Sequence, residues 1–285
     1  MSKVAIVTDS VACLTRHMAY DYSIHVVPVN IVFEGKVYRD WVDLTPSDAY
    51  RMLEKDPRRF TTSAASPVEY AAIFRPLCAE YQAILCIAVS SRLSTMHNTA
   101  QLAAEQMKTE YPNVSIEVLD SMTATAAEGF IALAAAREAR QGKELAEVSR
   151  AAREVRDKVS AVVVLETISH VYRTGRVPKI ASQIGALLNV KPIVTISDGA
   201  VHFLSASRTK QQAVEKMVAH VQRSVAGRPA HMAVMHADCA AEGQQLRDRV
   251  EAEFNCVELW LTEFSPVMAY GTGPGVLAIA YYCDN

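Results

Sequence analysis

Four clusters of hydroxyl-bearing residues carry the clearest chemical signal in the first half of the sequence. In a parallel sheet the carboxyl ends of the strands share one edge, and the helix N-termini beside them favour anions. The clusters therefore predict a site for a carboxylate or a phosphate, although Ser and Thr at any one position can simply cap a helix. Three clusters follow strand-like runs and one enters a helix: Thr8-Asp9-Ser10, Ser90-Ser91 with Ser94-Thr95, Asp120-Ser121, and TTSAAS at 61–66.

A second candidate is the loop GTGPG at 271–275, which lies between two apolar runs near the end of the chain. Glycines of this kind can bring backbone N–H groups close to a bound anion, or can form a tight bend before a last strand. The loop contains no titratable side chain. The sequence alone leaves both interpretations open.

Several common sites are missing from the sequence. It has no G-x-G-x-x-G, no G-x-x-x-x-G-K-[ST] and no G-x-S-x-G, so the usual nucleotide cradles and the α/β-hydrolase elbow are absent. His236, Asp238 and Cys239 stand too close together for a standard zinc site. No pair of acids stands out as a general acid and base. We therefore expect no metal, no cofactor and no catalytic residue.

The composition of the chain further narrows the classes of protein to which it could belong. Lys and Arg number 29 against 31 Asp and Glu, and no basic run is present, so nucleic acid is not an expected partner. No apolar stretch is long enough to form a transmembrane segment. The six cysteines are scattered and never form C-x-x-C, and the start of the chain does not resemble a signal peptide. These features predict a reduced, cytoplasmic protein.

The elements that position these residues alternate between strands and helices. Such alternation predicts an α/β fold with a parallel sheet covered on both faces. Thr45 with Pro46, and Ser66 with Pro67 and Glu69, mark helix starts. Pro28 suggests that its strand is an edge strand or is interrupted. The expected strands are 4–10, 25–33, 83–91 and 115–121, and Ala-rich helices are expected at 95–110 and 122–140.

The second half of the chain predicts a smaller, mixed-sheet α/β domain. Asp198-Gly199 lies between two β-rich runs and predicts a hairpin, which requires antiparallel strands. Further strands are expected at 161–168, 232–237, 257–264 and 277–282, and an apolar-faced helix at 179–188. We place the boundary at the charged helix near 153–160, which gives two domains, 1–158 and 159–285.

A series of short motifs runs along the whole chain. The motifs are VTDSVACL, VVPVNIVFEGKVYRDWVDLTP, TTSAASPVEY, VSSRLSTMHNTA, VLDS, ISHVYRTGRV, LLNVKPIVTISDG and GTGPG. They resemble the DegV family, the fatty-acid-binding subunits of bacterial fatty-acid kinase. Each motif is weakly specific, but their order over the chain is highly specific. The chain departs from the family pattern at Trp41, Thr95 and Thr174, where glycines are usual, at Ala64 and Ala65, and at Gly271, where the family has histidine.

The resemblance implies two α/β domains and a carrier of a long-chain fatty acid such as palmitate, not an enzyme. The carboxylate is expected at Thr62 and Ser94, with Ser63, Ser91, Gly271 and Thr272 as further candidates. Arg176 and Arg208 are expected near the head group, although surface salt bridges would explain them equally well. Ile184 and Leu188 are expected to line the acyl tunnel. A partner fatty-acid kinase would phosphorylate the carboxylate, and transient contact with a membrane surface is compatible with this role.

Two alternatives stay open. A serine-dependent acyl hydrolase would use Ser91 or Ser94 with His97 or His170 as base, and it needs that histidine within hydrogen-bond reach. The second alternative is a carrier of a different acidic lipid, such as an isoprenoid acid. Native mass spectrometry of the purified protein would identify a retained lipid, whereas ester turnover abolished by Ser94→Ala would favour the hydrolase.

Overall fold

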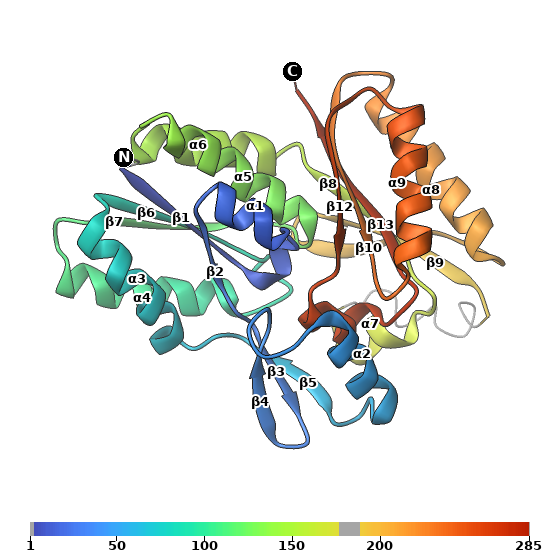
Figure 1. Ribbon diagram of the computed structural model, residues 1–285, viewed down its shortest axis with the longest axis horizontal. Coiled ribbons are helices and arrows are strands. Elements are labelled where there is room, and N and C mark those ends of the chain that lie inside the picture. Colours follow the sequence, from blue (N-terminus) through green and yellow to red (C-terminus); the bar gives the residue numbers. More distant parts are fainter. Residues whose placement is uncertain (1–2, 177–188, 285) are drawn as a thin grey trace.

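The computed structural model describes residues 3–176 and 189–284, and it contains two large sheets, each flanked by helices (Figure 1). A four-stranded sheet is built from the first half of the chain and a six-stranded sheet from the second half. The predicted fold class, a parallel α/β sheet followed by a mixed α/β sheet, is confirmed. The division at residue 158 stays a prediction, although the two sheets draw their strands from either side of it.

The first sheet is parallel throughout and has the order β2-β1-β6-β7. Helices α3 and α4 cover one face, while α5 and α6 cover the other (Figure 1). All four strand ends therefore meet at one edge, as the hydroxyl clusters predicted. The elements are β1 (Val4–Asp9), α1 (Arg16–Asp21), β2 (Ile24–Val27), α3 (Pro67–Glu80), β6 (Ala83–Ala88), α4 (Met96–Glu110), β7 (Ser115–Asp120), α5 (Ala126–Arg140) and α6 (Leu145–Arg156).

A small antiparallel sheet, with the order β4-β3-β5, was not expected from the sequence. Pro28 interrupts the predicted strand 25–33, so that β2 stays at the edge of the parallel sheet and β3 enters the small one. Strand β4 is largely exposed and β5 is rich in hydroxyls, so neither shows an apolar pattern. The elements are β3 (Asn30–Phe33), β4 (Lys36–Arg39), α2 (Pro46–Lys55) and β5 (Phe60–Ser63).

The six-stranded sheet has the order β10-β9-β8-β13-β11-β12 and is mixed, because only β11 and β12 run parallel. Its remaining neighbours are antiparallel, including the predicted hairpin of β9 and β10. The elements are β8 (Ser160–Val164), α7 (Ser169–Arg173), β9 (Lys191–Ser197), β10 (Ala200–Ser207), α8 (Lys210–Val225), β11 (Ala230–His236), α9 (Ala240–Glu253), β12 (Cys256–Glu263), the short helices η3 (Pro266–Met268) and α10 (Ala269–Thr272), and β13 (Leu277–Cys283).

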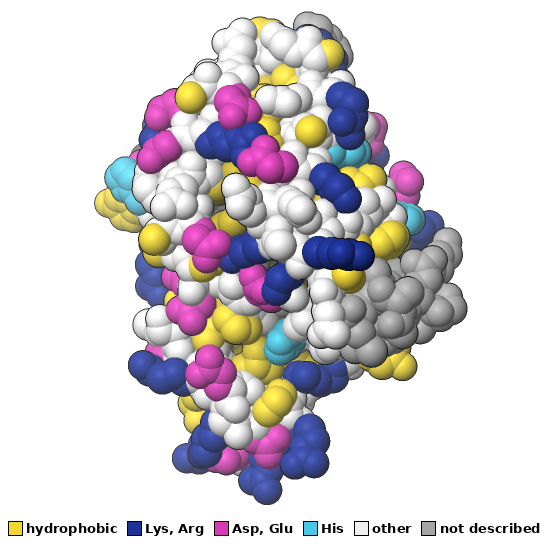
Figure 2. Space-filling model, turned by 90° about the vertical axis from the view of Figure 1, so that its right-hand side faces the viewer, with side chains coloured by type: hydrophobic (Ala, Val, Ile, Leu, Met, Phe, Trp, Pro, Cys, Tyr) yellow, Lys and Arg dark blue, Asp and Glu magenta, His cyan; other side chains and the backbone are white. Residues whose placement is uncertain are grey.

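Side chains alternate between two cores along the strands of this sheet. Val162 and Val164 pack with α8 and α9 on the outer face, whereas Ala161, Val163 and Leu165 pack toward α5. On the outer surface of the two helices, acidic and basic side chains are interspersed (Figure 2). The sheet is therefore covered by the outer helix pair on one face and by the first half of the chain on the other.

Helix α5 joins the two halves of the molecule. It contacts β1 and β6 of the parallel sheet and β8 and β13 of the mixed sheet. The ring centroid of Phe130 lies 4.3 Å from that of Trp260 and 5.2 Å from that of Tyr282. A Cβ atom on Gly129 would stand 2.6 Å from the carbonyl oxygen of Ala12, so this approach requires glycine. The Ala-rich composition of α5 thus reflects close packing on nearly every side.

The tip of the β9–β10 hairpin docks on the carboxyl edge of the parallel sheet. Asp198 has φ +50° and Gly199 has φ +76°, the pair of left-handed residues that a type I′ turn needs. The Gly199 N–H donates to the carbonyl oxygen of Met122 at 2.8 Å, and the Ser90 hydroxyl donates to the Gly199 carbonyl at 2.8 Å. Two hydrogen bonds therefore fix the mixed sheet to the end of β6 and β7.

Both helix starts that the sequence marked are confirmed. Thr45 caps α2 and Ser66 caps α3, each within a complete capping box. Within residues 3–176 and 189–284, none of the helices combines the length and the apolar character needed to cross a membrane.

We expect Gly199→Ala to lower the free energy of unfolding more than Gly35→Ala does. Both glycines have a left-handed backbone, with φ +76° and +79°, so alanine costs each about 1–2 kcal/mol. Only at Gly199 would the new Cβ stand 2.7 Å from the Ser90 hydroxyl, which adds about 1–3 kcal/mol of overpacking. Chemical denaturation of both variants measures the difference. Equal losses would show that the docked tip contributes nothing to stability.

Candidate functional site

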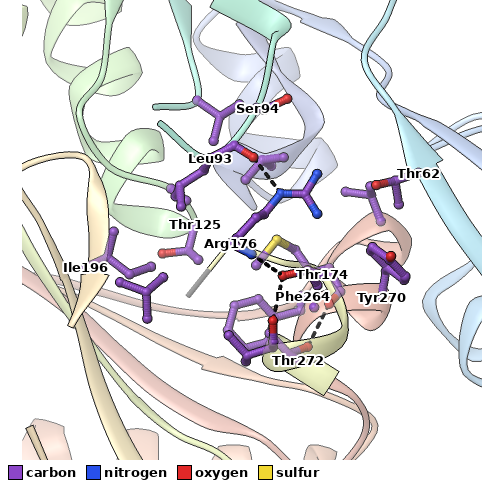
Figure 3. Close-up of a pocket in the computed structure, with 18 of the residues that line it drawn as sticks. Thr62, Leu93, Ser94, Thr125, Thr174, Arg176, Ile196, Phe264, Tyr270 and Thr272 are labelled. Carbon is purple, nitrogen blue, oxygen red and sulfur yellow. Dashed lines mark hydrogen bonds between the residues drawn. The ribbon is translucent and has the colours of Figure 1, made fainter. Parts of the chain in front are cut away.

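A cavity of about 150 Å³ lies where the carboxyl edge of the parallel sheet faces the mixed sheet (Figure 3). Its wall divides into an apolar part, supplied mainly by the mixed sheet and its loops, and a polar part, supplied equally by the first half of the chain and by the segments around α7 and α10. The apolar residues include Val163, Leu165, Val171, Val194, Ile196, Val201, Phe264, Val267 and Met268, and the polar ones are Thr62, Ser63, Ser94, Thr125, Thr174, Arg176, Tyr270 and Thr272.

Thr62 and Ser94 provide free hydroxyl groups at the polar part. Thr62 stands in β5, which reaches the cavity because Phe60 on the same strand stacks on Tyr270 of α10 at 6.3 Å. Its hydroxyl has no hydrogen-bond partner among the residues that the structure describes. The Ser94 oxygen accepts the N–H of Met96 at 3.3 Å, which leaves the Ser94 hydroxyl proton free to donate.

Arg176 places a positive charge in the middle of the polar residues (Figure 3). Its Nε donates to the carbonyl oxygen of Leu93 at 2.5 Å, which orients the guanidinium toward the loop that carries Ser94. No carboxylate within residues 3–176 and 189–284 forms an ion pair with it. By contrast, the hydroxyls of Thr174 and Thr272 are already used, since they donate to the carbonyls of Val171 and Met268 at 2.6 and 2.8 Å.

Two long helices begin at the cavity. Thr95 precedes α4 and Thr125 precedes α5, and neither side chain bonds to the first N–H groups of its helix. Those N–H groups and the helix dipoles favour a negative charge at this end. Thr125 is a lining residue that the sequence reasoning missed, because nothing in its local pattern distinguishes it from an ordinary cap.

The GTGPG loop forms part of the cavity wall and also bends the chain into β13. Gly273 has φ +69°, and a Cβ there would lie 2.4 Å from the His170 ring. Gly275 has φ +78°, and its N–H donates to the carbonyl of Ala237 at 2.6 Å. Position 271 does not require glycine, because its φ is not positive and a Cβ there would meet only Thr174, at 3.8 Å. Two of the three glycines are therefore required by the backbone, and Gly271 is not.

Two buried carboxyl groups hold the backbone behind the wall. Asp9 accepts the N–H groups of Val11 and Val89 at 3.0 and 2.8 Å, and both valines line the cavity. Burial raises the pKa of Asp9 to about 6 despite these bonds. Asp40 accepts the N–H of Val267 at 3.3 Å, and burial raises its pKa to about 7.

A third buried acid, Glu128, lies next to Asp9. It accepts the Thr8 hydroxyl at 3.1 Å, and burial and the neighbouring Asp9 raise its pKa well above the usual range. The raised pKa favours the protonated form of Glu128, which reduces the negative charge close to the cavity.

Most of the predicted site residues come together. Ser91 and Arg208 do not line the cavity, so their expected places near the head group stay predictions. The Ser91 N–H is 3.3 Å from the Asp120 carboxylate, and Arg208 follows β10 about 20 Å of strand beyond Val201. Ile184 and Leu188 lie outside the described residues. The residues that do line the cavity are Thr62, Ser63, Ser94, Arg176, Gly271 and Thr272.

The hydrolase alternative finds no support in this geometry. Neither His97 nor His170 hydrogen-bonds to Ser91 or Ser94 in the part of the chain that the structure describes, and neither histidine lines the cavity. Burial and the charge of Arg173 lower the pKa of His170. Within the same residues no group of three or more His, Cys, Asp or Glu is arranged to hold a metal ion.

Comparison with known proteins assigns the family. A family model described as "Uncharacterised protein, DegV family" matches residues 3–284. This chain belongs to the DegV family. A DegV domain-containing protein of Clostridium acetobutylicum is 30% identical, covering 99% of this chain and 98% of that protein, and one of Mycobacterium tuberculosis is 31% identical over 97% and 96%.

Solved DegV structures have the same fold. A DegV family protein from Thermus thermophilus, described by its fatty-acid binding, matches with a TM-score of 0.91 and 26% identity over 100% of both chains. DegV from Bacillus subtilis, described as a fatty acid binding protein, matches with a TM-score of 0.89, also at 26% identity over 100% of both chains.

The departures from the DegV motifs have different structural costs. Trp41, where the family has glycine, adopts φ +70°, so a bulky residue occupies a backbone conformation that suits glycine. Arg16 lies over its ring at 5.7 Å. Thr95 and Thr174 also replace family glycines, but their φ values of −85° and −69° suit any residue. Of these three departures, only Trp41 therefore has a backbone conformation whose strain local contacts must offset.

The buried acids predict that this DegV protein loses stability as pH rises. A carboxyl whose pKa is higher in the folded than in the unfolded chain binds its proton more tightly when folded, so the free energy of unfolding falls between about pH 4 and the folded pKa. For Asp40 that window extends to about pH 7. Each unit of the shift corresponds to about 1.4 kcal/mol. We expect Asp40→Asn to flatten the decline between pH 5 and 7.

Chemical denaturation at pH 5, 6 and 7 measures this slope. The matched control is Asp43→Asn, since Asp43 is paired with Arg39 and its pKa is lowered to about 2, outside the range tested. If the free energy of unfolding of Asp40→Asn fell with pH as steeply as that of the natural chain, Asp40 would not be the source of the decline.

Proposed function

We propose that this chain binds a long-chain fatty acid such as palmitate, with its carboxylate near Thr62, Ser94 and Arg176 and its tail along the apolar wall. The observation that carries the proposal is the division of one cavity into a hydroxyl-rich, positively charged part and an apolar part. The DegV proteins of T. thermophilus and B. subtilis, both described as binding fatty acids, support the same ligand class.

The energetics assign different roles to the two parts of the cavity. A sixteen-carbon tail buries roughly fourteen methylenes at about 0.8 kcal/mol each, about 11 kcal/mol before ordering costs. A hydrogen bond to a charged group contributes about 1.5–3 kcal/mol. The tail therefore dominates affinity. Thr62, Ser94 and Arg176 set the position of the head group and prevent a buried carboxylate from losing its hydrogen bonds.

Electrostatics favour an anionic head group over a neutral one. The Arg176 guanidinium has no ion pair among the described residues, and the N-termini of α4 and α5 face the same space. The raised pKa values of Asp9, Asp40 and Glu128 reduce the opposing negative charge behind the wall. Another acidic lipid, such as an isoprenoid acid, satisfies these groups equally well and differs only in how its tail fits.

The proposed role is that of a cytoplasmic carrier that presents the carboxylate to a partner fatty-acid kinase, which converts it to an acyl-phosphate. The polar part of the cavity lies beside exposed residues, among them Arg176, so a partner protein has access to the head group. Loading from a membrane would need only a transient surface contact. In this scheme the chain supplies binding and orientation, and the kinase supplies the phosphoryl-transfer chemistry.

We expect Thr62→Val to weaken palmitate binding by roughly 1–3 kcal/mol, because it removes a hydroxyl donor without changing the shape of the side chain. Fatty-acid titration by calorimetry or by displacement of a fluorescent fatty acid measures the loss. Valine is also well accommodated in a strand such as β5. Ser94→Ala is a less clean probe, since Ser94 also accepts an N–H at the start of α4.

The paired control is the methyl ester of palmitate, which has the same tail but no charge. Its affinity should change less in Thr62→Val than the affinity of the free acid. Loss of the same size for acid and ester would mean that Thr62 does not contact the head group.

The second expectation concerns Gly271, which stands where the DegV motif has histidine. We expect Gly271→His to raise kinase-dependent acyl-phosphate formation more than it raises fatty-acid affinity, because an imidazole N–H would add a donor at the carboxylate. Tyr270 lines the cavity, whereas neither His97 nor His170 is among the described residues that line it, although the His170 ring packs against Gly273 of the same loop. The backbone at Gly271 accepts a side chain without left-handed strain.

The measurement is a pair of assays on the natural and Gly271→His proteins, fatty-acid titration and phosphorylation by a DegV-family partner kinase. Gly273→Ala is a folding control, since its Cβ would collide with His170 and should destabilise the chain. Robust phosphorylation of the natural protein, unimproved by histidine, would refute the role given to this position.

A further inference from the structure

The cavity contains a polar position that the proposed head-group site does not use. Thr125 lines the cavity on the opposite side of Arg176 from Thr62 (Figure 3). Its side chain is 1% exposed, and its hydroxyl has no hydrogen-bond partner among the residues that the structure describes. Buried hydroxyls are almost always paired, so an unpaired one facing a cavity indicates a partner on a ligand.

The backbone keeps this hydroxyl away from its own helix. Thr125 has φ +67° and ψ −159°, a conformation that β-branched residues rarely adopt. A Thr before a helix normally accepts an N–H of the first turn, but this side chain makes no such bond. Strain of this kind persists only where the surrounding structure imposes it, and it concentrates at binding sites.

The N-terminus of α5 adds donors at the same place. The N–H of Ala126 faces the sulfur of Met235 at 3.4 Å, and a thioether is a weak acceptor. The helix is fifteen residues long, so its dipole contributes fully at this end. The Thr125 hydroxyl and the N–H groups at the start of α5 are hydrogen-bond donors. Together they suit an oxygen atom of a ligand that accepts hydrogen bonds.

The position of this oxygen follows from the sheet. Ser94 follows β6 and Thr125 follows β7, and these neighbouring strands pair in parallel up to Ala88 and Asp120. Neighbouring strands lie about 4.8 Å apart, so the loops that carry the two residues leave adjacent ends of the same edge, and both residues line the one cavity. An oxygen beside Thr125 would therefore belong to the carboxylate end of the acyl chain. Further along, the wall turns to Ile196 and Val194, which offer no partner.

We propose that Thr125 and the N-terminus of α5 form a subsite for an oxygen on the acyl chain close to its carboxylate, so that the cavity prefers a 3-hydroxy fatty acid to the unsubstituted acid of the same length. This inference rests on the proposed function, in which Thr62 and Ser94 hold the carboxylate. A hydroxyl fixed in one place also predicts discrimination between the two enantiomers of the ligand.

The test compares palmitate with (R)- and (S)-3-hydroxypalmitate by titration of the full chain and of three variants. We expect the natural protein to bind one enantiomer about tenfold tighter than palmitate, the equivalent of one well-made buried hydrogen bond. Thr125→Val keeps the shape and removes the hydroxyl, so the preference should disappear while palmitate affinity changes little. Thr125→Ser keeps the hydroxyl and should retain the preference.

If the Thr125→Val protein does not fold, Thr125→Gly provides a second test. Glycine adopts the left-handed backbone without strain and also removes the hydroxyl. A preference that persists in Thr125→Val or Thr125→Gly overturns the subsite. Equal weakening of palmitate and both hydroxy acids also overturns it, because Thr125 would then be a ligand of the carboxylate. A natural protein that binds palmitate without any preference refutes the subsite alone, whereas one that binds none of the three acids refutes the proposed function as well.

Discussion

The close packing of α5 between two sheets is the constraint on which the rest of the structure depends. A helix that contacts β1 and β6 on one side and β8 and β13 on the other has little room for large side chains, which explains its alanines and the glycine at position 129. Because the same helix belongs to both cores, the relative position of the sheets is set by its packing. The docked tip at Gly199 fixes a second point, so the two sheets cannot separate at the edge without breaking two hydrogen bonds.

The cavity forms where this packing ends. At the N-terminus of α5, residues of α7, α10 and β5 join buried core side chains in lining the space between the sheets. The site is therefore apolar where the mixed sheet supplies its wall and polar where strand ends and helix starts meet. The cost of this arrangement is the burial of Asp9, Asp40 and Glu128, whose carboxyl groups hold the wall in place and titrate above their usual range for that reason.

Local patterns were predictable from the sequence, and long-range convergence was predictable only in part. Capping boxes and the Asp198-Gly199 turn depend on neighbours in sequence, and they form as expected. The predicted strand 25–33, by contrast, divides at Pro28 into β2 and β3, and the predicted strand 161–168 ends at Val164. Strand β4 was missed because its stability comes from pairing with β3 and not from a buried pattern of its own. Ser91 and Arg208 fall outside the cavity wall because a motif fixes a position along the chain but not the direction of a side chain or the distance along a strand. Thr125 carries no local signal, because nothing in the residues around it distinguishes it from an ordinary cap.

The glycine-rich loop shows why a loop in the cavity wall can lack a titratable residue. Gly273 and Gly275 are fixed by backbone geometry, because their left-handed conformations let the chain pass against His170 and Glu166 and then enter β13. That constraint leaves position 271 free, with ordinary backbone angles and open space beside Thr174. The loop can therefore keep its shape, and its place in the cavity wall, whichever residue stands at 271. Shape and head-group chemistry are separable in this loop, and the natural sequence retains the first without the side chain that would supply the second.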